Sequence, residues 1–231
     1  MRPTKLHYLT KSAELAHSAE TEQLANCSEY DKMLYLLSRH KKDLKGIQSM
    51  EKRAEYKKAI LPNYLPWIEG ALNAGNGKQD NVLMTWQVWA IDCGQFNLAL
   101  TIADYALHQQ LALPEPFTRT LGTMLAEEFA DYAKAAQLAG KDFEVSYLER
   151  VAELVKDEDM PDESRARLYR ELGLLKIESD PESALATLER ALALNPNIGV
   201  KGEVKKLRKQ LNKPDDDSQD KEEIMTAGSV N

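Results

Sequence analysis

The sequence predicts an all-α protein, in which a long N-terminal helix is followed by an α-solenoid-like bundle of shorter helices. Apolar residues recur at three- and four-residue spacing through most of the 231 residues, and no segment sustains the period-two alternation of a strand. Two segments also repeat one spacing of small and apolar residues, which is typical of stacked helix pairs. We therefore expect no substantial sheet.

Residues 29–61 are predicted to form one helix, about 45 Å long at about 1.5 Å per residue. Ser28 or Asp31 can cap its start. One face carries a heptad seam, which weakens at Glu51. Because such a seam packs against a neighbouring helix, we predict that it forms an interface between copies of the chain. The seam residues are Met33, Leu37, His40, Leu44 and Ile47.

The opposite face of this helix is basic. Residues 31–60 carry nine Lys and Arg against four Asp and Glu, a net charge of +5, whereas residues 61–200 carry a net charge of −11. An acidic body of this kind would repel phosphate, so nucleic acid could be contacted only through the basic segments. The predicted DNA-contacting residues are Arg39, Lys42, Lys45, Lys52 and Arg53. The alternative is a solvated face, with Glu51 and Glu55 as neighbouring partners of the lysines.

Residues 60–94 contain all three tryptophans, Trp67, Trp86 and Trp89, so a core is expected to form here. Pro62 and Pro66 should end the incoming helix near residue 61. A short helix through Trp67 should stop at the glycines of residues 75–77, and a second helix should follow over residues 82–90.

Further helices are expected over residues 95–112, 117–139 and 143–155, and again from Pro161 onward. Residues 168–197 match the spacing of a tetratricopeptide unit. The matching residues are Tyr169, Leu172, Gly173, Ala184, Leu188, Ala191 and Pro196. A weaker version of the pattern begins at Trp86. Residues 62–213 are therefore predicted to be a helical-repeat domain, which ends in a basic amphipathic helix over residues 200–213.

The two ends of the chain are predicted to lie outside the folded domain. Residues 1–28 are polar and weakly patterned, so a flexible arm is expected. Residues 214–231 carry a net charge of −5 and are predicted to be a disordered acidic tail. Ile224 and Met225 are an apolar pair within this tail, and they are either a docking point or two isolated apolar residues.

The sequence shows no catalytic constellation. Asp162 with Glu203 and Lys205 has the letters of a nuclease motif, but that motif places its acids on a β-hairpin, and both pieces are helical here. The histidines show no metal-ligand spacing and there is no phosphate-binding glycine loop, so we expect no metal and no cofactor. No apolar run approaches the ~18 residues of a membrane span, and we expect a cytosolic protein with reduced cysteines.

Several separate blocks carry a family resemblance. The runs LPNYLPW (residues 61–67), QDNVLMT (79–85), DCG (92–94), ALTIADYAL (99–107) and MPDESRARLYRELGLL (160–175) resemble the small terminase subunit of Peduovirus-type tailed phages, in similar order and spacing. The resemblance implies a ring-forming subunit of the packaging motor in the host cytoplasm. Such a subunit binds double-stranded cohesive-end viral DNA and presents it to the large subunit, which holds the ATPase and the nuclease.

Three hypotheses about function follow from these observations. The resemblance implies the DNA-recognition subunit just described. Proteins of this family are often called endonuclease subunits, so intrinsic cutting at the cohesive end is a second reading. The solenoid by itself would imply a third, a peptide-binding helical scaffold without DNA binding.

Overall fold

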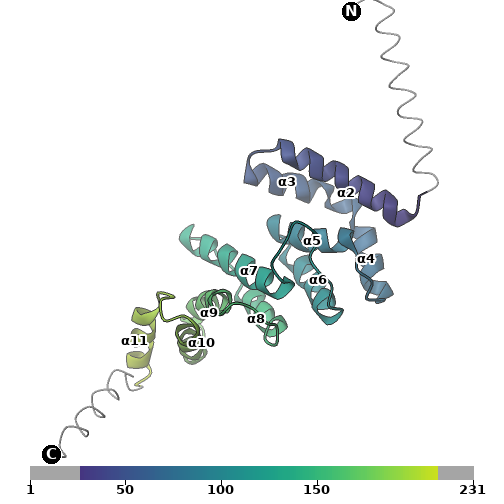
Figure 1. Ribbon diagram of the computed structural model, residues 1–231. Coiled ribbons are helices and arrows are strands. Elements are labelled where there is room, and N and C mark those ends of the chain that lie inside the picture. Colours follow the sequence, from purple (N-terminus) through teal and green to yellow (C-terminus); the bar gives the residue numbers. More distant parts are fainter. Residues whose placement is uncertain (1–26, 213–231) are drawn as a thin grey trace, which may run out of the picture. The chain divides into compact units, whose positions relative to one another are not determined.

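The computed structural model describes residues 27–212 (Figure 1). Ten α-helices and one short 3-10 helix make up this part of the chain, which contains no strand, so the all-α prediction is confirmed for it. The chain divides into two compact units, residues 1–64 and residues 65–231. The acidic tail and all of the N-terminal arm except residues 27–28 lie outside the described residues.

The first unit is a helical hairpin of α2 (Glu29–Gly46) and α3 (Met50–Ile60), followed by the 3-10 helix η1 (Leu61–Asn63). The prediction of one helix through residues 29–61 is therefore wrong. Ile47 leaves α2 in an extended conformation, and the Ser49 side chain caps α3 by accepting a bond from the Lys52 N–H at 3.3 Å. The weak helix former Gly46 and the capping residue Ser49 are the local signals for this break.

The second unit begins with α4 (Leu65–Ala74) and α5 (Asn81–Asp92). The Asp80 side chain makes hydrogen bonds to both helices. One carboxylate oxygen of Asp80 accepts the Val82 and Leu83 N–H groups and so caps α5, while the other accepts the Trp67 indole N–H at 2.8 Å. Trp86 is fully buried and packs edge-on against Trp89, with ring centroids 5.4 Å apart. The predicted tryptophan core is present.

An aromatic cluster links the next three helices, α6 (Phe96–His108), α7 (Leu121–Leu138) and α8 (Val145–Leu154). The Phe96 ring lies 5.3 to 5.4 Å from four other rings, which are those of Phe129, Tyr132, Phe143 and Tyr147. Edge-to-face contacts of this kind add to the stability that burial provides. The predicted small-residue face of α6, including Ala99 and Ala103, is buried.

The unit ends with α9 (Asp162–Lys176), α10 (Pro181–Leu194) and α11 (Lys201–Gln210). A Cβ atom on Gly173 would lie 2.6 Å from Leu188 Cγ and 3.3 Å from the Ala184 carbonyl oxygen, so this glycine allows α9 and α10 to approach closely. Helices of this unit pack mainly against helices one or two places away along the chain, as Figure 1 shows from α7 to α11. No helix within residues 27–212 is long and apolar enough to cross a membrane.

Candidate nucleic-acid interface

Four of the five predicted DNA-contacting side chains are exposed on the α2–α3 hairpin. Arg39, Lys42 and Lys45 follow one another at three-residue spacing on α2, which places them along one side of the helix. Lys52 is exposed on the first turn of α3. Within residues 27–212 none of the four makes an ion pair, so their charges face solvent without a neutralising partner.

Arg53 differs from the other four, because its side chain is half-buried and used inside the hairpin. Its Nε donates to the Ile47 carbonyl oxygen at 2.6 Å, which is one of the carbonyl groups at the end of α2. A guanidinium at this position satisfies a terminal carbonyl and lies at the negative end of the helix dipole. The structure thus places Arg53 at the turn, where its hydrogen bond links α3 to the end of α2.

The second unit uses its basic side chains in a different way. Most of its arginines hold an acidic side chain from another helix or loop, as Arg150 does with Asp104 at 2.9 Å. Within residues 65–212, the other cations with an acidic partner are Arg119, Lys156, Arg167, Arg170, Lys176 and Arg208. Paired cations offer little attraction to phosphate, so the cations in these pairs contribute little to a phosphate-binding surface.

Part of the predicted heptad seam is occupied within the chain. Leu37 and Leu44 are buried, with 2% and 8% of their surface exposed. His40 Nδ1 lies 2.7 Å from the Tyr64 hydroxyl, and its ring packs edge-on against Tyr56. Met33 and Ile47 are half-buried. The seam therefore packs the hairpin itself, and its role between copies stays a prediction.

The His40 network has a defined electrostatic character. Burial lowers the pKa of His40, an effect that Asp43 partly offsets and Arg39 reinforces. The Tyr56 hydroxyl donates to the Asp43 carboxylate at 2.8 Å, and burial together with this bond raises the pKa of Tyr56 to about 12. Burial in the hairpin therefore favours the neutral form of the His40 imidazole.

A pH dependence follows for the first unit. Because the folded pKa of His40 lies below the ordinary histidine value of 6.5, the unfolded chain binds more protons as pH falls through that value. Protection of the α3 amides against hydrogen exchange, corrected for intrinsic rates, should therefore fall between pH 7.5 and pH 5.5. His40→Asn keeps an acceptor near Tyr64 and should flatten this dependence. An equal loss of protection in that variant would contradict the assignment.

The comparisons with known proteins bear on this chain as a whole. A family model described as phage small terminase subunit matches residues 34–163, more than half of the chain. The chain belongs to this family. The match begins within the basic hairpin and ends at the start of α9. The predicted resemblance is therefore confirmed.

Two relatives of this small terminase chain are informative. The chain is 39% identical over 220 residues to a protein of Escherichia phage P2 named "Terminase, endonuclease subunit", which covers 95% of this chain and 89% of that protein. It is 23% identical over 188 residues to the "Probable terminase, endonuclease subunit" of Haemophilus phage HP1, which covers 74% of this chain and 67% of that protein. No solved structure matches it.

Helix α11 offers this small terminase chain a second basic surface. Val204 and Leu207 are buried against the unit, while Arg208 donates to Glu189 at 2.8 Å. The exposed cations are Lys201, Lys205, Lys206 and Lys209. This surface is the rival to the hairpin, but the acidic residues 214–231 follow it directly in the sequence and would compete for it.

The nuclease-like letter patterns do not converge in this member of the family. Asp162 lies at the start of α9, whereas Glu203 and Lys205 lie on α11, which packs mainly against α10. Asp43 with Lys45 and Glu55 with Lys57 have similar letters, but Asp43 accepts a bond from Tyr56 and Lys57 is buried. Among residues 27–212, no three His, Cys, Asp or Glu side chains gather in a way that could hold a metal ion.

Proposed function

We propose that this chain is the DNA-recognition subunit of a phage packaging terminase. The exposed face of the α2–α3 hairpin binds cohesive-end double-stranded viral DNA and presents it to the large subunit, which holds the ATPase and nuclease, in the host cytoplasm. The observation that carries the proposal is the set of unpaired cations on this hairpin, Arg39, Lys42, Lys45 and Lys52. Family membership supports the packaging role.

Residues 31–60 and residues 61–200 carry net charges of opposite sign. Phosphate is repelled by residues 61–200, which carry a net charge of −11 and hold most of their arginines in ion pairs. Residues 31–60 carry a net charge of +5, and five of their nine basic side chains are exposed, namely Arg39, Lys42, Lys45, Lys52 and Lys58. Each phosphate that a lysine or arginine neutralises contributes about −0.9 to the slope of log affinity against log salt. Binding by this surface is therefore steeply salt-dependent.

The proposal includes a homo-oligomeric ring. One hairpin offers the five exposed cations named above, Lys58 included, and repetition around a closed ring would let several modest patches hold one duplex. The successive packing of α5 to α11 supports a tetratricopeptide-like solenoid as the body of each subunit. Light scattering at micromolar protein should give the mass of roughly eight to twelve copies, and a mass of 26.1 kDa, that of one chain, would contradict the ring. Because Leu44 is buried in its own chain, the half-buried Met33 is the better site for an interface variant, Met33→Glu.

The experiment that tests the function is a mobility shift with cohesive-end DNA across a salt series. We expect binding at low salt that weakens linearly in a plot of log affinity against log salt. A peptide-binding scaffold, the alternative function, predicts no shift at any salt concentration. A duplex of the same length without the cohesive end separates recognition of the site from general attraction to DNA.

Intrinsic cutting is the remaining alternative, because both relatives are named as endonuclease subunits. We propose that this chain alone does not cut, since its nuclease-like acids lie on different helices and a metal-dependent nuclease needs them to converge. Purified protein with cohesive-end DNA and Mg²⁺ should leave the duplex intact. Nicking that disappears in Asp162→Ala would overturn this part of the proposal.

A further inference from the structure

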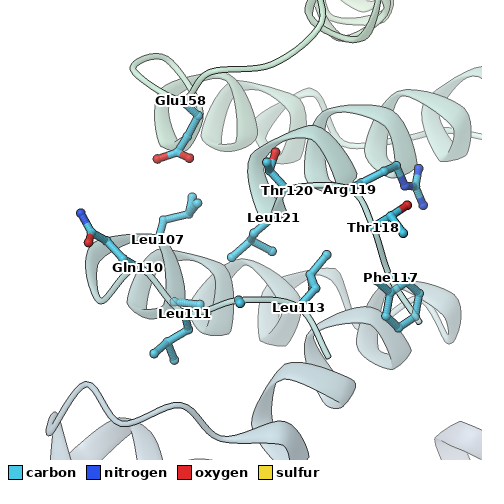
Figure 2. Close-up of a pocket in the computed structure, with 12 residues that line it drawn as sticks. Leu107, Gln110, Leu111, Leu113, Phe117, Thr118, Arg119, Thr120, Leu121 and Glu158 are labelled. Atoms are coloured by element: carbon cyan, nitrogen blue, oxygen red, sulfur yellow. The ribbon is translucent and has the colours of Figure 1, made fainter. Parts of the chain in front are cut away.

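A hollow of about 500 Å³ lies in the second unit, between the end of α6, the connection to α7, the start of α7 and the connection from α8 to α9. Figure 2 shows leucine side chains from three segments around it, with Glu158 across from Leu107 and Gln110. The exposed ring of Phe117 stands at its edge and is 37% accessible, which is unusual for a large apolar side chain. The apolar lining includes Leu107, Leu111, Leu113, Phe117 and Leu121.

Hydrogen bonds hold the segments that line this hollow in position. The Gln79 side-chain amide makes two bonds to Ala112, donating to its carbonyl oxygen at 2.8 Å and accepting from its N–H at 2.9 Å. The Leu111 N–H donates to the Ala106 carbonyl oxygen at 2.8 Å, and the Thr120 side chain caps α7. The connection from α6 to α7 is therefore held against its neighbours, so the hollow is preformed.

The charge around the hollow is acidic. Arg119 lines it, but its guanidinium binds Glu127 and Glu128 and so carries no free charge. Glu158 lines the opposite side and belongs to residues 156–165, where five acidic residues outnumber Lys156 and Arg165, a net charge of −3. An apolar hollow with an acidic lip favours an apolar segment that is flanked by lysine or arginine.

One segment of this chain has that composition. Residues 1–13 contain Arg2, Lys5 and Lys11 and no acidic residue, and Leu6, Tyr8 and Leu9 lie between the basic positions. We propose that residues 2–11, from the same or a neighbouring copy of the chain, bind in the hollow between α6, α7 and the α8–α9 connection. Residues 11–27 span up to about 55 Å at ~3.3–3.6 Å each, which gives the segment a long reach.

The other apolar segment outside the structure fits less well. Ile224 and Met225 lie within residues 214–231, which carry a net charge of −5 and would be repelled by the acidic lip. The contact with residues 2–11 goes beyond the proposed DNA binding and does not depend on it. It assigns a role to the N-terminal segment and an occupant to this hollow.

The test is hydrogen exchange on the full-length protein, read by mass spectrometry. Amides of residues 4–11 should exchange about tenfold more slowly than their intrinsic rates, as expected if nine of ten molecules are bound. The variant Leu113→Asp, which places a charge in the lining of the hollow, should return these amides to their intrinsic rates. Leu138→Asp is the matched control, because Leu138 is 81% exposed on α7 and does not line the hollow. It should leave the protection unchanged.

A second variant keeps the test decisive if Leu113→Asp disturbs the fold. Leu6→Asp combined with Leu9→Asp leaves the hollow untouched and should speed exchange over residues 107–121, while exchange in α9 and α10 stays the same. Two results would overturn the proposal. One is intrinsic exchange of residues 4–11 in the unmodified protein. The other is protection that survives Leu113→Asp in a protein whose α9 and α10 remain protected.

Discussion

Reversing two charges on α2, Lys42→Glu with Lys45→Glu, is expected to weaken the binding of cohesive-end DNA by about 100-fold near 0.1 M salt. Both side chains are exposed and have no ion pair within residues 27–212, so their loss costs phosphate contacts and leaves no internal partner unpaired. The slope of log affinity against log salt should become shallower by about 2 for each hairpin that touches the duplex. Mobility shift across a salt series measures both quantities.

The matched control is Lys205→Glu with Lys206→Glu on α11. It makes the same change in formal charge at two lysines that are also exposed. If binding responded only to the net charge of the protein, the two double variants would behave alike. We expect the α11 variant to bind nearly as well as the unmodified chain. Abolished binding in the α11 variant, with no effect on the hairpin, would move the DNA interface to α11.

Gly173→Ala is expected to destabilise the second unit by about 1–2 kcal/mol. The added methyl group would meet Leu188 Cγ at 2.6 Å, and Leu188 is fully buried, so it has no space into which to withdraw. Overpacking of this kind costs about 1–3 kcal/mol, whereas alanine gains only up to about 1 kcal/mol over glycine in a helix. Thermal unfolding followed by tryptophan fluorescence reports on this unit, because all three tryptophans lie in it.

Gly202→Ala provides a control of opposite sign. Gly202 lies in α11, and nothing is within 4 Å of the position that its Cβ would occupy. The same substitution there should stabilise the helix by up to about 1 kcal/mol through propensity alone. Equal effects at both glycines would show that Gly173 does not set the distance between α9 and α10.

Much of the helix inventory could be predicted from local residues. The prolines at 62 and 66 predict the end of α3 near residue 61, and the structure ends α3 at Ile60. The glycines at 75 and 77 predict a turn, and both adopt positive φ. Such signals act over a few residues, through backbone sterics and caps, so they can be read without knowing what packs where. The break at residues 47–49 had local signals as well, but the apparent continuity of the heptad seam outweighed them in the prediction.

The tertiary structure decided what each side chain does. The seam residues Leu37 and His40 pack inside their own hairpin, and Arg53 fastens the turn, although spacing alone placed them at an interface and on the DNA surface. Several ion pairs of the second unit join residues far apart in sequence, such as Arg167 with Asp131, which are 36 positions apart. Sequence spacing determines which residues share a helix face, whereas the availability of a charge depends on which distant residues folding brings within a few ångströms of it.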